Sequence, residues 1–398
     1  MGLWVMAGAK QQPPEESFEG QLISGKYRVE RLIGSGGMGT VWLGHHEVLG
    51  TRVAIKFIRR AFAERPDARR RFEIEARAAA SVKTRHAVDV YDYGLTDTGL
   101  PYIVMEYLEG ESLSEVLVRR GPMAPHEVSS IISQAARALT KAHQSGIVHR
   151  DLKPDNIFLA TNVEHDDAAP YVVKLVDFGI AKILDTAQTG QFGGPTQDGA
   201  VIGTPNFMSP EQLTVGGAPN ALTDLWSLGA CTFAAFTARI PFEGEVLGDI
   251  VLKVCMHPMP VPSAYNAAVP AGFDAWFSRA CARDPKKRFQ SAEELAEELA
   301  KVCGVSPSAS KIRQSVAEPA EVMYQLKPAD PAMVAELEKL QAPQGMSART
   351  ALMAGLVIGI TLMIGVLGAL AWRAKVAEEE TLKPPVEAAS GDAGAPKK

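Results

Sequence analysis

Strand-like patterns of hydrophobic and polar residues occupy several segments near the start of the chain. Residues 27–33 alternate as a half-buried strand does, and residues 40–43 and 52–58 are rich in β-branched and other large apolar side chains. Residues 101–110 contain an apolar run that leads into a polar connector, which predicts a buried strand. This early part of the chain is therefore expected to be rich in strands.

Apolar residues recur at helical spacing in other segments. Helices are predicted over residues 66–81, near 112–119, over 126–144 and over 291–302. In the longest of them Val128, Ile131, Ala135 and Leu139 fall on one face, and Gly146 closes the helix. Most of these helices follow the strands along the chain.

Residues 350–372 differ from every other segment because they contain no charge. This stretch of 23 residues lies between Arg349 and Arg373. About 20 apolar residues cross the hydrocarbon core of a bilayer, so the stretch predicts a single transmembrane helix. Gly355 and Gly359 form a GxxxG spacing that allows close packing of two such helices. A homodimer is one expectation, although a Gly-rich span often contains this spacing by chance.

Composition divides the remainder of the chain. Residues 1–26 are polar and contain prolines, and are expected to form a flexible extension without a signal peptide. Residues 304–349 are rich in Ser, Pro and Ala and predict a juxtamembrane linker without its own core. The expected folded domain is residues 27–303, and residues 373–398 form a short tail on the other side of the membrane.

Overall composition limits the classes of function. The chain is 46% hydrophobic and 22% charged, as globular proteins are. Its net charge of −5 gives no indication of nucleic-acid binding. The four cysteines are widely spaced without a CxxC, which favours reduced thiols over disulfides or a zinc site.

Glycines 34, 36 and 39 follow the first predicted strand. Glycine lets backbone amides approach phosphate oxygens closely because no side chain intervenes. The same GxGxxG spacing occurs in dinucleotide-binding turns, but those open a helix at the last glycine. Here Gly39 leads into a strand-like run. The pattern therefore favours a strand–loop–strand flap over a nucleotide.

Lys56 lies inside the apolar run of residues 52–58. A buried lysine is costly unless it is paired, so either it faces outward from a half-exposed strand or it has a carboxylate partner. Glu75, in the middle of the next predicted helix, is the favoured partner, and Glu73 is the competing one.

Residues 149–156 read His-Arg-Asp-Leu-Lys-Pro-Asp-Asn and combine a carboxylate, a cation and a carboxamide in one short loop. Asp151 can accept or orient the proton of an attacking hydroxyl. Lys153 can neutralise charge on a transferred phosphoryl group, and Asn156 can hold a metal ion. The string predicts phosphoryl transfer to a hydroxyl.

Together with Val-Ala-Ile-Lys at 53–56 and Asp-Phe-Gly at 177–179, these motifs resemble the Hanks-type protein kinases, close to the bacterial receptor-like Ser/Thr kinases. The resemblance covers about residues 27–303. It implies an α+β bilobal fold with a small β-rich lobe and a larger helical lobe, followed here by one transmembrane helix. ATP, Mg²⁺ and protein substrates are the implied ligands and partners.

The resemblance implies a role for each matching residue. Asp151 would be the catalytic base, Lys153 would contact the γ-phosphate, and Asn156 and Asp177 would bind magnesium. Met105 would be the gatekeeper, the backbone from Glu106 to Leu108 would form the hinge, and Lys56 would bind phosphates and pair with Glu75. The implied ATP contacts as a whole are Ile33, Gly34, Ser35, Gly36, Gly37, Met38, Gly39, Val41, Ala54, Lys56, Glu75, Met105, Glu106, Leu108 and Phe158.

Residues 203–211 resemble the peptide-binding segment of the family. Phe207 replaces the more usual tyrosine. Glu211 would pair with Arg288, and Asp224 would tie down the catalytic loop from a buried helix. Around His86 the chain departs from the family, so the resemblance gives that residue no role.

Regulation is expected at Arg150, which in such kinases binds a phosphate on the activation loop. Thr196 matches the autophosphorylation site of bacterial relatives, although it could also be an ordinary polar loop residue. Thr204, like Lys153, is a family mark of Ser/Thr rather than Tyr preference.

The leading hypothesis is a membrane-anchored Ser/Thr protein kinase. A catalytically silent pseudokinase scaffold is the alternative, disfavoured because Lys56, Asp151, Asn156 and Asp177 are all present. A small-molecule kinase is disfavoured by the peptide-binding segment. Basic residues flank the apolar stretch on both sides and do not decide its orientation. The need for ATP places the kinase domain in the cytoplasm, at the cell membrane.

Overall fold

The structure is a computed structural model of the whole chain. It describes residues 16–36, 39–60, 72, 76–77, 79–161, 171–178, 205–214, 217–244 and 246–305. The predicted linker, transmembrane stretch and tail lie outside these residues. Within the part of the chain that the structure describes, no helix is both long and apolar enough to cross a membrane.

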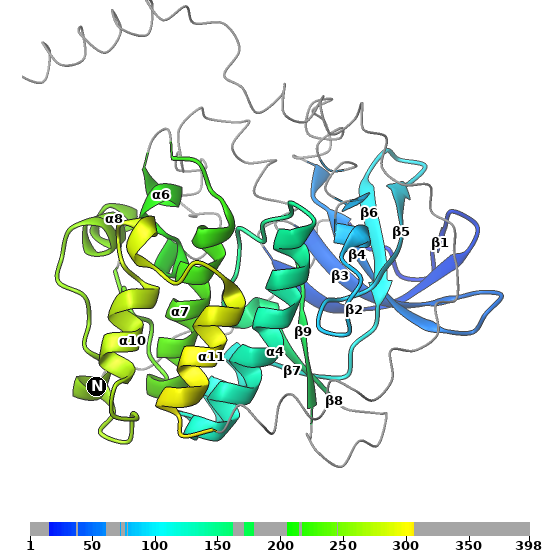
Figure 1. The fold of residues 1–398 in the computed structure, drawn as a ribbon. Helices are drawn as coiled ribbons and strands as arrows, with labels where there is room; N and C mark the ends of the chain where they lie inside the picture. The colour runs from blue at the N-terminus through cyan, green and yellow to red at the C-terminus, as the bar shows by residue number, and fades with distance from the viewer. Residues whose placement is uncertain are drawn as a thin grey trace, which may run out of the picture. The chain divides into compact units, whose positions relative to one another are not determined.

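The N-lobe, residues 16–106, is built on a six-stranded antiparallel sheet (Figure 1). The strands predicted from the sequence are all present. In spatial order the sheet contains β1 (Leu22–Ile23), β2 (Tyr27–Gly36), β3 (Gly39–His46), β4 (Arg52–Ile58), β6 (Pro101–Glu106) and β5 (Val90–Leu95).

Strand β4 is covered on both faces. Val53, Ile55 and Phe57 point into one apolar cluster, while Ala54 and Ile58 pack in two other clusters. Lys56 shares the face of Ala54 because side chains alternate along a strand. The apolar run of residues 52–58 is therefore explained by burial on both sides.

The described fold begins before Tyr27, the start expected from the sequence. Phe18 is buried and stacks on Phe57, with ring centroids 3.9 Å apart, and meets Trp42 edge-on at 5.9 Å. Ile23 is buried in the same cluster. The segment from Glu16 onwards thus covers the outer face of the sheet, a packing that its polar composition did not suggest.

The C-lobe, residues 110–305, is mainly helical (Figure 1). Helix α7 is its centre, since nearly every residue along it is buried. The helices are α3 (Leu113–Arg120), α4 (Pro125–Gln144), α6 (Pro210–Leu213), α7 (Ala221–Thr237), α8 (Leu247–Cys255), α9 (Pro262–Tyr265), α10 (Phe273–Ala280) and α11 (Ala292–Val302). Three short 3₁₀ turns are η1 (Pro154–Asn156), η2 (Pro205–Phe207) and η3 (Pro285–Lys287).

A small sheet lies at the edge of the C-lobe, with β7 (Gly110–Ser112), β8 (Ile157–Thr161) and β9 (Tyr171–Leu175) in that order. The loop of residues 145–153 lies between α4 and η1, just before β8. This places the HRDLKPDN string where the two lobes meet.

His86 joins the lobes. Its ring Nδ1 lies 3.1 Å from the carbonyl oxygen of Val173, and its own carbonyl accepts the N–H of Leu175 at 2.8 Å. Burial, helped by the charges of Arg137, Arg85 and Lys174, outweighs the hydrogen bond to Val173 and lowers the pKa of His86 to about 4. The imidazole is therefore neutral at pH 7, a structural role that the sequence left open.

Candidate active site

Buried Asp224 holds the catalytic loop, as the sequence predicted. Its Oδ2 accepts the N–H of His149 and its Oδ1 accepts the N–H of Arg150, both at 2.8 Å. His143 adds a third contact to Asp224, at 2.8 Å from Nε2. Asp224 has no exposed surface because α7 is the core helix. One carboxylate on α7 thus fixes the backbone of the catalytic loop.

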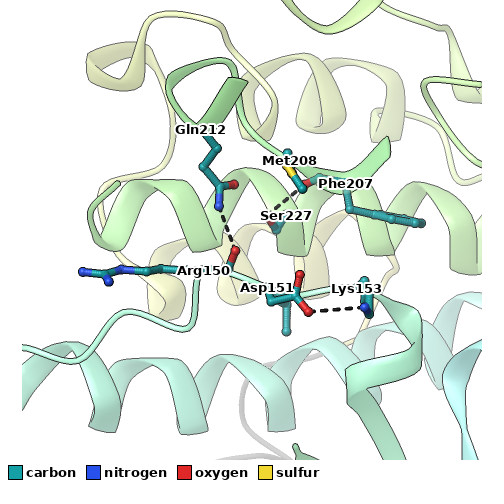
Figure 2. A pocket seen from close by; sticks show the side chains of 8 residues that line it. Arg150, Asp151, Lys153, Phe207, Met208, Gln212 and Ser227 are labelled. Atoms are coloured by element: carbon teal, nitrogen blue, oxygen red, sulfur yellow. Dashed lines mark hydrogen bonds and ion pairs between the residues drawn. The ribbon is translucent and has the colours of Figure 1, made fainter. Parts of the chain in front are cut away.

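Asp151, Lys153 and Asn156 converge above that clamp. The Lys153 Nζ lies 3.2 Å from Asp151 Oδ2 (Figure 2). Asn156 donates through Nδ2 to the Asp151 carbonyl oxygen at 2.7 Å and to its Oδ2 at 3.2 Å. Burial alone would lower the pKa of Lys153, but the charges of Asp151 and other nearby carboxylates outweigh it, so this pKa is raised. Lys153 therefore stays cationic beside Asp151.

Asp177 faces Lys56 from the C-lobe. The Lys56 Nζ lies 2.6 Å from Asp177 Oδ1. Phe178 packs into the C-lobe core, and Asp177 adopts a left-handed backbone with φ of 56°. The predicted partner of Lys56, Glu75, lies outside the described residues, so the Lys56–Glu75 pair stays a prediction.

Asn156 and Asp177 supply oxygen donors for the implied magnesium site. Asn156 uses its Nδ2 on Asp151, which leaves its carbonyl Oδ1 as the ligand atom. Asp177 supplies a carboxylate. Among the described residues no group of three or more His, Cys, Asp or Glu side chains could hold a metal. A two-ligand oxygen set fits Mg²⁺, which usually completes its shell with water and substrate phosphates.

The glycine-rich hairpin joins β2 and β3, with Gly36 opposite Gly39. A Cβ on Gly39 would lie 2.0 Å from the carbonyl oxygen of Phe57, so only glycine fits there. Ile33, Gly34 and Ser35 belong to the same end of β2. Gly37 and Met38, also predicted to contact ATP, lie outside the described residues.

An apolar patch lies between the hairpin and the hinge. Ala54 and Met105 are buried together with Val88, and half-buried Val41 and Leu108 pack against them. These four predicted ATP contacts, Val41, Ala54, Met105 and Leu108, therefore come together. Phe158 is half-buried on β8 and is not a member of this cluster. Glu106, at the end of β6, is held by Lys174 at 2.8 Å.

Residues 205–213 form a platform beside the catalytic loop. Glu211 in α6 and Arg288 form a bidentate ion pair, Nη1–Oε1 at 2.7 Å and Nη2–Oε2 at 2.8 Å. Burial alone would raise the pKa of Glu211, but the hydrogen bond and charge of Arg288 outweigh it and lower this pKa. The predicted pair is confirmed. Phe207, which replaces the usual tyrosine, is buried.

Gln212 makes a contact with the catalytic loop that the sequence did not predict. Its Nε2 donates to the carbonyl oxygen of Arg150 at 2.7 Å, so the platform touches the catalytic loop (Figure 2). The partner of Gln212 is 62 positions away in sequence, so no local pattern marks this contact. The predicted regulatory residues Thr196 and Thr204 lie outside the described residues.

A nucleotide-binding phosphotransferase is the class defined by two lobes with a glycine-rich hairpin, a cleft lysine and an acidic loop. The pattern described as "Protein kinase domain" matches residues 27–299. The chain belongs to this protein kinase family.

Curated relatives include the serine/threonine-protein kinases PrkC of Bacillus subtilis and PknB of Mycobacterium tuberculosis. PrkC is 37% identical over 70% of this chain and 41% of its own length. PknB is 38% identical over 73% of this chain and 45% of its own length. Pkn1 of Myxococcus xanthus is 39% identical over 67% of this chain and 37% of its own length. The chain thus spans less than half the length of these relatives.

Among solved structures, the PknI kinase domain of Mycobacterium tuberculosis is similar, with a TM-score of 0.55 and 28% identity. The similarity covers 71% of this chain and 98% of that one. It supports the bilobal fold.

Proposed function

We propose that this chain is a Ser/Thr protein kinase that transfers the γ-phosphoryl group of ATP to protein hydroxyls. The observation that carries the proposal is the constellation of Asp151, Lys153 and Asn156 at the lobe junction, with Asp177 opposite Lys56. A cleft lysine, a catalytic loop and a metal-binding carboxylate are the groups that phosphoryl transfer needs.

Each residue contributes to one part of the reaction. The hydroxyl oxygen of the substrate forms a bond to the γ-phosphorus as the bond to the ADP oxygen breaks, and Asp151 takes the hydroxyl proton. Lys153, cationic beside Asp151, stabilises charge on the transferred group. Lys56 binds phosphate oxygens. Mg²⁺, held by Asn156 and Asp177 when bound, would neutralise charge on the phosphates.

Protein hydroxyls are the favoured acceptor for two reasons. The relatives PrkC, PknB and Pkn1 are named serine/threonine-protein kinases. The platform of residues 205–213, tied to the C-lobe by the Glu211–Arg288 pair, offers a surface for a peptide beside Asp151. A small-molecule kinase would not need such a surface. The silent scaffold is disfavoured because the catalytic residues are present and, where described, assembled.

Membrane anchoring through residues 350–372 is part of the proposal. It rests on 23 uncharged residues, more than a bilayer crossing needs. The nucleotide requirement places the kinase domain in the cytoplasm. A homodimer through Gly355 and Gly359 follows from the GxxxG spacing. Fractionation of the full chain with membranes, and its release when residues 350–372 are deleted, would support the anchor.

Autophosphorylation at Thr196 is the proposed regulation. A phosphate there adds about −1.5 to −2 charges, which would pair with Arg150. Mapping phosphosites in an active preparation tests this point, and an unmodified Thr196 would remove it.

The test of the proposed activity uses the full chain in lipid with MgATP and a mixture of Ser/Thr and Tyr peptides. The expected result is phosphoserine and phosphothreonine, absent with Asp151→Asn. No transfer by the wild-type chain would favour the scaffold, and transfer unchanged in Asp151→Asn would remove Asp151 as the base.

A further inference from the structure

The peptide bond between Arg150 and Asp151 is held from several sides. Arg150 is one of the few described residues other than glycine with a left-handed backbone, at φ of 63°. This conformation costs a non-glycine residue on the order of 1 kcal/mol and persists where the surroundings impose it. Asp224 accepts the N–H of Arg150, and the N–H of Asp151 donates to the His149 carbonyl at 2.8 Å.

Gln212 supplies the remaining contact, on the carbonyl oxygen of Arg150. Its Nε2 donates to that oxygen at 2.7 Å (Figure 2). Its Oε1 accepts the N–H of Ser209 at 3.1 Å. Both ends of the side-chain amide are therefore used, and Gln212 is only 3% exposed. The amide bridges Ser209, the N-cap residue of the platform helix, and Arg150, the residue before the catalytic aspartate.

We infer that Gln212 is a positioning residue that links the position of the platform to the orientation of the Asp151 side chain. The carbonyl it holds belongs to the same planar peptide group as the N–H of Asp151. Rotation of that plane turns the Asp151 side chain away from the substrate hydroxyl. The inference deepens the proposed kinase activity and rests on it.

Two substitutions separate the two ends of the amide. Gln212→Glu keeps an acceptor for Ser209, as the glutamate of a capping box does, but an ionised carboxylate opposes the Arg150 carbonyl. Gln212→Met keeps the shape and loses both contacts. Thr214→Ala is the matched control, because Thr214 is the exposed C-cap residue of the same helix, two positions after Gln212.

The experiment measures kcat and KM for full-length variants. It also measures the stoichiometry of MgADP binding, which gives the fraction of molecules whose nucleotide site is folded. We expect Gln212→Glu to lower kcat by about 10- to 100-fold at pH 8, since small misplacements of reacting groups cost that much. KM for ATP and MgADP stoichiometry stay as in the wild type. Gln212→Met lowers kcat less, and Thr214→Ala does not change it.

A pH profile provides the readout that simple loss of packing would not move. Protonation of the introduced glutamate restores a donor to the Arg150 carbonyl, so the ratio of Gln212→Glu to wild-type kcat should rise from pH 8 to pH 6. The inference would be overturned if kcat of Gln212→Glu equalled that of Thr214→Ala. It would also be overturned if the loss of kcat in Gln212→Glu were matched by an equal loss of MgADP binding. An inactive wild-type chain would overturn the proposed function and the inference with it.

Discussion

Glu211 and Arg288 form an ion pair under the platform, while Lys56 and Asp177 form one across the cleft. The Arg288 side chain is fully buried and bonds both oxygens of Glu211, as well as the carbonyls of Ala282 and Leu222. Among the described residues the cleft pair has one contact, and its Lys56 and Asp177 side chains are 13% and 39% exposed. The platform pair is more enclosed, since the Arg288 and Glu211 side chains are 0% and 15% exposed.

The difference follows from what each pair has to do. The platform pair is part of the fold, so every donor of Arg288 is used within the C-lobe. The cleft pair consists of groups that must also meet phosphates and a metal ion. A single, part-exposed contact can be exchanged for ligand contacts at low cost, because water already competes for it. We therefore expect Arg288 to contribute mainly to the stability of the fold and Lys56 mainly to phosphoryl transfer.

Arg288→Met should have the largest effect, a loss of about 3–5 kcal/mol in the free energy of unfolding. The reason is that Glu211, a largely buried carboxylate, would lose its cation while the hydrogen bond from Thr223 remained. Urea unfolding of the full chain measures it. Lys287→Met, an exposed neighbour, is the control and should change little. A loss under about 1 kcal/mol for Arg288→Met would mean that the platform pair is no more structural than a surface pair.

Phe18→Ala tests whether the strand that carries Lys56 is supported from outside. Removing the ring stacked on Phe57 should cost about 3 kcal/mol, as other buried Phe→Ala substitutions do. Phosphoryl transfer should continue in the protein that remains folded. Glu19→Ala, an exposed change in the same segment, is the comparison. Unchanged unfolding in Phe18→Ala would show that the upstream segment does not support the sheet.

His86 gives a smaller, pH-dependent effect at a joint without an ion pair. Its folded pKa of about 4 lies below the ordinary 6.5, so between these values the unfolded chain binds a proton that the folded protein excludes. Stability should fall as pH drops through that window, by about 2 kcal/mol between pH 7 and pH 5. His86→Asn should remove much of this slope, and exposed His126→Asn should not. An equal slope in both variants would assign it to other groups.

The sequence predicted the fold class, the strands β2, β3, β4 and β6, and most of the site because these depend on local patterns. The run of residues 52–58 and the HRDLKPDN string each carry their meaning within a few neighbours. Phe18 was missed because a lone aromatic in a polar segment gives no period to detect. Gln212 was missed because its partner Arg150 is 62 positions away in sequence. Contacts that depend on tertiary placement leave no local signal.

Lys56→Met tests whether Lys56 serves phosphoryl transfer and contributes little to stability. Transfer and urea unfolding are measured on the same preparation of the full chain. The account predicts that transfer falls by about 100-fold or more, equivalent to about 2.7 kcal/mol of activation free energy, because phosphate positioning is lost. The free energy of unfolding should stay within about 1 kcal/mol of wild type, as expected for a part-exposed pair. A protein that keeps its transfer rate, or that loses stability as Arg288→Met does, would contradict the assignment.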